Sequence, residues 1–242
     1  MANLIEIFSS VQGEGKYVGC RQIFIRTADC NLNCAYCDTN FKRGEFCNVE
    51  TSAGSMIFEQ IKNPVEAAQV AEIIKRFNFE APTHSVSFTG GEPLLNWKFI
   101  REISDLIKNT GLKIFLETNG TLPDELSQII NFVDIISMDI KLPSVAGNYF
   151  DKHREFLKIA APKDLYAKIV ISSETTQEEF DAAINLIAEV SPEILLILQP
   201  VTPVKNVKSI SARKILELQA RALQKLKSVR VIPQTHRLIN IF

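Results

Sequence analysis

Three cysteines within one short stretch are the strongest chemical signal in this sequence. Cys30, Cys34 and Cys37 stand in the spacing C-x3-C-x2-C. A structural zinc site or an ordinary four-cysteine cluster takes four protein ligands, so three thiolates in one loop fall one ligand short. Such a site keeps a metal coordination position open for a reactant. The spacing therefore predicts a metal centre that takes part in chemistry.

A structural zinc site is the alternative interpretation of these cysteines. Either Cys47 or Cys20 would then supply the fourth ligand, and Cys47 follows Cys37 by only ten residues. A zinc-stabilised binding protein of this kind would be colourless and would hold one zinc. The competing interpretation predicts a brown protein with about four irons and labile sulfide.

The cysteine spacing resembles that of the radical S-adenosylmethionine (SAM) superfamily. In those enzymes three cysteines hold a [4Fe-4S] cluster, and the fourth iron chelates the amino and carboxylate groups of SAM. Tyr36, just before the third cysteine, also fits the superfamily pattern. The resemblance places Tyr36 and the adjacent Asp38 at the SAM site.

The next residue, Thr39, has two interpretations. Aspartate and threonine are good N-cap residues, and from spacing alone Asp38 and Thr39 are favoured as the cap of a following helix. The functional alternative is that the Thr39 hydroxyl supplies a hard oxygen ligand to Mg²⁺.

Polar and glycine-rich segments follow several predicted strands. The sequence TGGEP at 89–93 comes after one strand, where paired glycines permit close backbone approach to a ligand, or simply make a tight turn. It resembles the superfamily element whose backbone binds the methionine amino group of SAM, here at Gly91. Polar residues also follow three later strands, and the resemblance assigns the following to SAM: Ser137, Asp139, Lys141 and Gln199.

Short apolar runs alternate with longer amphipathic segments along the chain. The runs predict strands, because both faces of a parallel sheet are covered, and the segments carry apolar residues at helical spacing. The expected strands are Gln22–Arg26, Ser85–Phe88, Lys113–Leu116, Ile135–Met138, Ala167–Ile171, Ile194–Leu198 and Val229–Ile232. The expected helices are Val65–Phe77, Trp97–Asn109, Asp124–Asn131, Tyr149–Ile159, Gln177–Val190 and Ala212–Lys227.

About six βα units of this kind predict an α/β fold, a partial (β/α)6 barrel of the TIM type. The whole chain, residues 1–242, is expected to form one domain. Residues 41–62 show no strong periodicity and are expected to be an irregular insertion.

Composition excludes several classes of protein. The chain has 27 lysines and arginines against 28 aspartates and glutamates, so no overall charge favours nucleic acid or an anionic membrane. No apolar run is long enough for a membrane helix, and the first residues lack the basic region of a signal peptide. Five cysteines, three of them clustered, argue against a disulfide framework. We expect a cytoplasmic protein.

Five motifs, in order, carry a more specific resemblance. They are QGEG at 12–15, FIR at 24–26, CNLNCAYCDT at 30–39, TGGEP at 89–93 and PQTH at 233–236. Together they closely resemble the family of 7-carboxy-7-deazaguanine synthases of the queuosine pathway. The resemblance assigns the following residues to a pterin substrate: Val11, Gln12, Gly13, Glu14, Arg26, Thr89, Gln234 and His236. Arg26 would grip the substrate carboxylate, and Thr39 would ligate Mg²⁺ rather than cap a helix.

The reaction implied by this resemblance is a radical ring contraction. SAM would be cleaved to methionine and a 5′-deoxyadenosyl radical, which would abstract the C6 hydrogen of 6-carboxy-5,6,7,8-tetrahydropterin. Rearrangement and loss of ammonia would give 7-carboxy-7-deazaguanine. The family implies a flavodoxin-like electron donor and a homodimer.

An activase that installs a glycyl radical on a partner enzyme is a further alternative. It shares the C-x3-C-x2-C spacing but has no need for Gln12, Glu14, Arg26 and His236.

Overall fold

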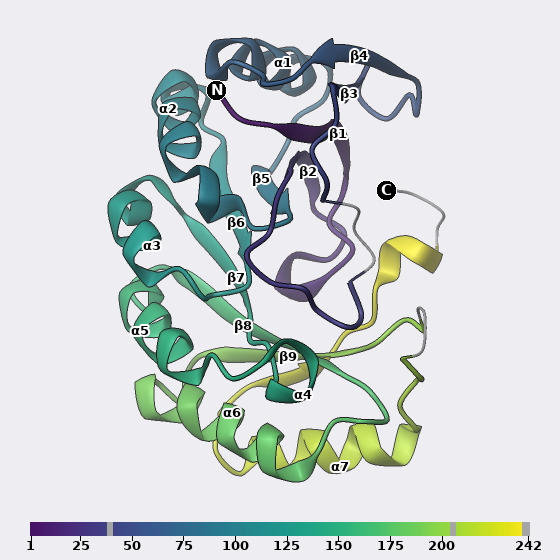
Figure 1. Cartoon of the computed structure of the whole chain (residues 1–242), viewed down its shortest axis with the longest axis vertical. Coiled ribbons are helices and arrows are strands. Elements are labelled where there is room, and N and C mark those ends of the chain that lie inside the picture. Colours follow the sequence, from purple (N-terminus) through teal and green to yellow (C-terminus); the bar gives the residue numbers. More distant parts are fainter. Residues whose placement is uncertain (38–40, 204–206, 239–242) are drawn as a thin grey trace.

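A ten-stranded sheet, mostly parallel, runs through the computed structural model, which describes residues 1–37, 41–203 and 207–238 (Figure 1). Its strand order is β10-β9-β8-β7-β6-β5-β2-β1-β3-β4. All neighbours from β2 to β10 are parallel, whereas β1 is antiparallel to β2 and β4 is antiparallel to β3. The strands are β1 Leu4–Val11, β2 Arg21–Thr27, β3 Phe46–Glu50, β4 Phe58–Lys62, β5 Ser85–Gly90, β6 Lys113–Thr118, β7 Ile135–Asp139, β8 Asp164–Ile171, β9 Leu195–Pro200 and β10 Val229–Val231.

Helices cover the outer face of the curved sheet, and each longer one packs against the next (Figure 1). They are α1 Ala67–Glu80, α2 Trp97–Ile107, α3 Pro123–Ile129, α4 Pro143–Ala146, α5 Phe150–Ala160, α6 Gln177–Val190 and α7 Ala212–Leu223. Strand–helix alternation from β2 to α7 gives six βα units, as predicted. Every predicted strand and helix is present, with boundaries that shift by up to three or four residues. The partial-barrel fold class is therefore confirmed.

Side chains alternate between two environments along the central strands. On β6 and β7, Leu116, Ile136 and Met138 belong to the large core between sheet and helices. Their neighbours Phe115 and Ile135 point to the concave face, where they pack with Tyr166 and Ile197. This period of two continues toward the carboxyl ends of the strands, so the next inward positions carry Glu117, Ser137, Lys168 and Gln199. The inside of the barrel is thus apolar at its base and polar at its mouth.

The prediction of an irregular insertion over residues 41–62 was wrong. This segment contains two five-residue strands, β3 and β4, which extend the sheet beyond β1. Cys47 and Val49 are fully buried on one face of β3. Two apolar residues at alternate positions are too few to give a clear strand signal among polar neighbours, and β1 escaped prediction as well. Cys47 lies in the core and, like Cys20, does not line the cavity described below, which argues against a zinc site with either as fourth ligand.

Helix α6 begins with a capping box formed by Thr176 and Glu179. Thr176 Oγ1 accepts a hydrogen bond from the Glu179 N–H at 3.3 Å, and Glu179 Oε1 accepts one from the Thr176 N–H at 2.8 Å. Gly111, with φ 75°, likewise ends the segment after α2 as expected. No helix in the described ranges is long and apolar enough to cross a membrane.

Replacing Thr176 by alanine should lower the free energy of unfolding by about 1 kcal/mol, because the Glu179 N–H in the first turn loses its acceptor. Urea denaturation of the variant and of wild type measures the difference. Ser209→Ala, at an exposed residue near α7, is the control and should unfold like wild type. Equal midpoints for all three proteins would contradict a stabilising role for the cap.

Candidate active site

A cavity of about 490 Å³ opens at the carboxyl ends of the parallel strands. This is the end at which barrels of this type hold their ligands. Every described residue that the sequence analysis assigns to the site lines this cavity, from Val11 at the end of β1 to His236. Asp38 and Thr39 lie outside the described residues. The sequence thus finds the wall of one cavity from segments more than 200 residues apart.

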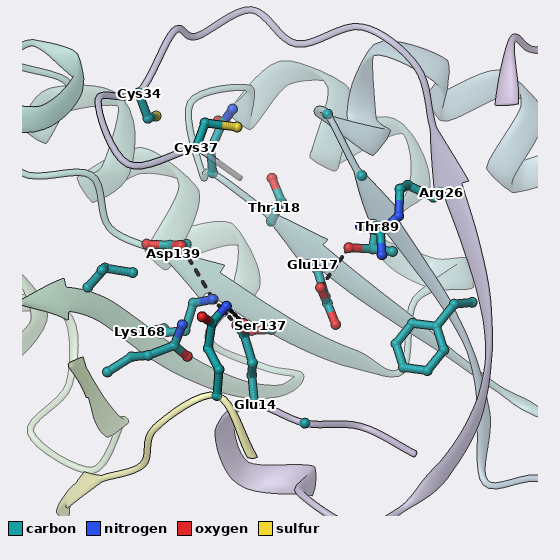
Figure 2. Close-up of a pocket in the computed structure, with 18 of the residues that line it drawn as sticks. Glu14, Arg26, Cys34, Cys37, Thr89, Glu117, Thr118, Ser137, Asp139 and Lys168 are labelled. Atoms are coloured by element: carbon teal, nitrogen blue, oxygen red, sulfur yellow. Dashed lines mark hydrogen bonds and ion pairs between the residues drawn. The ribbon is translucent and has the colours of Figure 1, made fainter. Parts of the chain in front are cut away.

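Cys30, Cys34 and Cys37 line the same end of the cavity, and Figure 2 shows the last two. The Leu32 N–H donates to Cys30 Sγ at 3.4 Å, and Asn119 Nδ2 donates to it at 3.9 Å. Burial raises the pKa of Cys34 to about 11, so its thiolate requires a cationic partner. Within the described ranges no three histidine, cysteine, aspartate or glutamate side chains converge on a single-ion site. The donor set of three thiols with N–H donors fits an iron–sulfur cluster.

The turn after β5 packs directly on the cysteine loop. A Cβ added to Gly91 would lie 1.7 Å from the Asp29 carbonyl oxygen, so only glycine permits this approach. Glu92 then ties the turn to the end of β6. Its Oε1 accepts from the Thr118 hydroxyl at 2.9 Å, and its Oε2 accepts from the Asn119 N–H at 2.8 Å. Burial raises the pKa of Glu92 to about 7, against the lowering effect of these hydrogen bonds.

Two groups of side chains divide the cavity. The cofactor side, next to the cysteines, contains Tyr36, Asp139, Lys141, Ser137 and Gln199. Lys141 Nζ lies 2.8 Å from Asp139 Oδ2 and 5.2 Å from the centre of the Tyr36 ring. Asp139 Oδ1 and Gln199 Oε1 are buried without a hydrogen-bond partner in the described structure. Two unpartnered acceptors in a cavity wall indicate a ligand that donates hydrogen bonds there.

The pterin side, named for the substrate that the sequence implies, contains Glu14, Arg26, Thr89, Gln234 and His236. Glu14 Oε1 accepts from Gln234 Nε2 at 2.7 Å, and Glu14 Oε2 accepts from Lys168 Nζ at 2.6 Å. Burial alone would raise the pKa of Glu14, but Lys168, the Gln234 hydrogen bond and the charge of His236 lower it to about 2. Glu14 is therefore an anionic acceptor at neutral pH.

Gln12 lines the cavity, and its side-chain amide is hydrogen-bonded to other parts of the protein. Its Nε2 donates to Gln22 Oε1 at 3.0 Å and to Glu117 Oε1 at 2.7 Å, and its Oε1 accepts from the Glu14 N–H at 3.0 Å. The amide is thus hydrogen-bonded within the protein, where it orients the Glu117 carboxylate and fixes the Glu14 backbone. Glu117, which also accepts from the Thr89 hydroxyl at 2.7 Å, presents its carboxylate to the cavity (Figure 2).

The carboxylate of Glu6 holds the Arg26 guanidinium through its Nε. Its Nε donates to Glu6 Oε1 at 2.7 Å, and its guanidinium carbon lies 5.8 Å from the centre of the Phe8 ring. The two terminal nitrogens have no partner among the described residues. A guanidinium fixed through Nε offers these nitrogens as a planar fork, the geometry that a carboxylate accepts.

Gly13 permits the two ends of the pterin side to meet. The Thr235 N–H donates to the Gly13 carbonyl oxygen at 2.8 Å. A Cβ added to Gly13 would lie 2.1 Å from His236 Nδ1, so a side chain there displaces the imidazole.

Gly13→Ala should therefore reduce kcat/KM for the pterin by about tenfold or more, since small displacements of positioning groups have effects of this size. Iron content should stay unchanged, because the clash lies far from the cysteines. Steady-state kinetics and iron analysis test both statements. Gly44→Ala, where the nearest atom to the added Cβ is 3.4 Å away, is the matched control. Equal kcat/KM in both variants would argue against the close contact.

Sequence reasoning missed two charged residues that line the cavity, Glu6 and Lys168. Lys168 lies within an apolar strand, and Glu6 lies on β1, which was not predicted. The alternation that places Tyr166 inside the barrel also places Lys168 there, two residues later, and would have found it.

Comparison with known proteins gives the class of this site. Residues 24–208 match the family model described as the radical SAM superfamily. The crystal structure of QueE from Escherichia coli superposes with a TM-score of 0.62 over 98% of this chain and 95% of that one, at 21% identity. A structure of TYW1 with a lysine-pyruvate adduct gives 0.56 over 85% and 74%, at 16% identity. The chain belongs to the radical SAM superfamily.

Relatives with higher sequence identity show which family of this superfamily the chain belongs to. A 7-carboxy-7-deazaguanine synthase from Geobacter sulfurreducens is 44% identical over 98% of this chain and 96% of its own length. One from Methanocaldococcus jannaschii is 38% identical over 98% of both. The chain is a member of the 7-carboxy-7-deazaguanine synthase family of the queuosine pathway. Full-length identity at this level decides against the activase and zinc-protein alternatives.

Proposed function

We propose that the chain converts 6-carboxy-5,6,7,8-tetrahydropterin to 7-carboxy-7-deazaguanine with loss of ammonia. The observation that carries the proposal is that a single cavity joins three thiols to the guanidinium of Arg26 and a set of polar side chains. The names and full-length similarity of the relatives support the same reaction.

On the cofactor side, Cys30, Cys34 and Cys37 would hold a [4Fe-4S] cluster. The Gly91 backbone, Ser137 and Lys141 would bind SAM, together with Tyr36 and Asp38. When bound, the cluster and SAM supply one-electron chemistry that generates a carbon radical able to abstract hydrogen. Asp139 Oδ1 and Gln199 Oε1, both buried and unpartnered, would accept hydrogen bonds from the ligand and fix its orientation.

On the pterin side, Arg26 would bind the substrate carboxylate through its two terminal nitrogens. Glu14 and Glu117 are acceptors for the amino and ring N–H groups, and Thr89, Gln234 and His236 complete the contacts with the Val11 and Gly13 backbone. Gln12 acts by holding the Glu117 carboxylate and the Glu14 backbone in place. Fixing both ends of a rigid ring system aligns one C–H bond with the cofactor side, and the buried walls keep water away.

We further propose that Thr39 ligates Mg²⁺ beside the substrate carboxylate, since a hard oxygen ligand suits that ion. The test is to remove all divalent ions with a chelator and then add back divalent ions other than Mg²⁺. Full turnover of the pterin under these conditions would count against a role for Mg²⁺. We also propose a flavodoxin-like protein as electron donor, a homodimer as the assembly, and the cytoplasm as the location, because free thiols persist in a reducing compartment.

Anaerobic turnover by the reconstituted protein tests the proposed reaction. The mixture contains SAM, a reductant, Mg²⁺ and 6-carboxytetrahydropterin, and mass spectrometry follows the products. A product lighter by the loss of ammonia is expected. Cleavage of SAM with an unchanged pterin would overturn the proposed substrate while leaving the superfamily chemistry intact.

A further inference from the structure

Lys168 lies between the two sides of the cavity. Its Nζ is 2.6 Å from Glu14 Oε2 on the pterin side and 3.4 Å from Asp139 Oδ2 on the cofactor side. Figure 2 shows the lysine between these carboxylates, with dashed lines to both. Among the described residues no other ion pair joins the two sides.

The surroundings of Lys168 keep its ammonium close to these two carboxylates. Its side chain is only 12% exposed, as is that of Lys141, while those of Glu14 and Asp139 are 21% and 15% exposed. A buried ammonium needs a carboxylate partner, and each carboxylate needs a cation or donors. Burial lowers the pKa of Lys168, but the two carboxylates more than reverse this, so the lysine stays charged at neutral pH.

The two carboxylates do not share the lysine equally. Glu14 holds it closely and also accepts from Gln234, so both its oxygens are used. Asp139 shares one oxygen between Lys141 and the more distant Lys168, while its Oδ1 has no partner in the described structure. A short movement of the ammonium would therefore weaken its ion pair with Glu14 and strengthen its ion pair with Asp139.

We propose that Lys168 is a positioning residue that couples the two sides, so that a ligand on the pterin side tightens the binding of SAM. This inference rests on the proposed function, because it takes the occupants of the two sides from it. The physical basis is the limited supply of positive charge: one ammonium serves two buried carboxylates. When ring N–H groups donate to Glu14, that carboxylate needs Lys168 less, and the ammonium can move toward Asp139.

The consequence falls on Asp139. With two ammonium groups on Oδ2, its side chain is fixed in one orientation and Oδ1 is presented to the ligand on the cofactor side. SAM then binds to a wall that is already ordered, which raises its affinity. Thermodynamic linkage requires the reverse effect to be equal: SAM must tighten binding on the pterin side by the same factor.

Calorimetry on the anaerobic, cluster-loaded protein tests the coupling without turnover. The Kd of SAM is measured alone and in the presence of saturating 7-carboxy-7-deazaguanine, which occupies the pterin side without reacting. We expect the product to tighten SAM about threefold or more in wild type, within the usual range of coupling between sites. In Lys168→Met the ratio of the two Kd values should fall to one, although each ligand still binds.

Lys141→Met is the matched control. It removes a lysine from the same Asp139 oxygen but has no contact with Glu14. This variant should weaken the binding of SAM by the same factor in both measurements, so that the ratio of the two Kd values stays as in wild type. If Lys168→Met fails to hold its cluster, Lys168→Gln replaces it, since it loses the charge but keeps hydrogen-bonding groups.

A ratio of one in wild type, or a wild-type ratio in the Lys168 variants, would overturn the coupling. The proposed function is judged separately by product formation in wild type. A wild-type protein that forms the product but shows a ratio of one loses only the coupling. If the wild-type protein forms no product from the pterin, the proposed function itself is wrong.

Discussion

Replacing Cys34 by alanine should abolish the iron–sulfur cluster and, with it, all cleavage of SAM. Two thiols cannot hold a cluster whose remaining ligand is a reactant, so iron and labile sulfide should both fall to background. The brown colour, the low-temperature electron paramagnetic resonance signal of the reduced protein and the release of 5′-deoxyadenosine report the loss independently. The fold should survive, because Cys34 contributes no side chain to the main core.

Cys20→Ser is the matched control for this prediction. Cys20 is also partly exposed, but it does not line the cavity. Its variant should assemble a normal cluster and cleave SAM like wild type. Appreciable 5′-deoxyadenosine from Cys34→Ala would remove the cysteine from the ligand set.

Arg26→Ala should reduce kcat/KM for the pterin by about 10²–10³-fold while the cluster assembles normally. The variant loses a charge-assisted fork on the substrate carboxylate, an interaction whose loss costs about 2–5 kcal/mol when the partner is buried. It also leaves Glu6, with 18% of its side chain exposed, without its cation. Steady-state kinetics with product detection measure the loss in kcat/KM, and iron content shows whether the cluster assembles normally.

Two further variants separate charge from geometry at this position. Arg26→Lys keeps the charge but loses the planar fork, so its kcat/KM should lie between those of wild type and the alanine variant. Glu6→Gln keeps an oxygen acceptor for Arg26 Nε and should cause a smaller loss than Arg26→Lys. An unchanged KM for the pterin in Arg26→Ala would refute the carboxylate clamp.

Much of the fold could be predicted from periodicity, because the six βα units carry strong and regular apolar patterns. The sheet extension could not, because β3 and β4 bury few apolar side chains and β1 mixes Glu6 and two serines with its apolar residues. Its partners also lie in distant parts of the sequence, so no local pattern announces the pairing of β1 with both β2 and β3.

The members of the site could be predicted better than their contacts. Motifs bring Gln12, Glu14 and Arg26 to attention, and all three line the cavity. The contacts that each of these residues makes depend on distances in the folded chain, which a sequence motif does not contain. Only the folded chain shows that the Gln12 amide is used by Glu117 and Gln22, that Glu6 holds Arg26, and that Lys168 serves two carboxylates.

The hydrogen bonds between Gly13 and Thr235, and between Glu14 and Gln234, also constrain the order of events during biosynthesis. Their partners are separated by more than 200 residues, so the ribosome must complete almost the entire sequence before these contacts can form. The cysteine loop and its supports at Gly91 and Asn119 emerge much earlier and can fold locally. Closing the longest loop last leaves the ring-binding wall as the slowest part of the molecule to mature. A nascent chain would therefore be ready for iron–sulfur delivery before it could recognise a pterin.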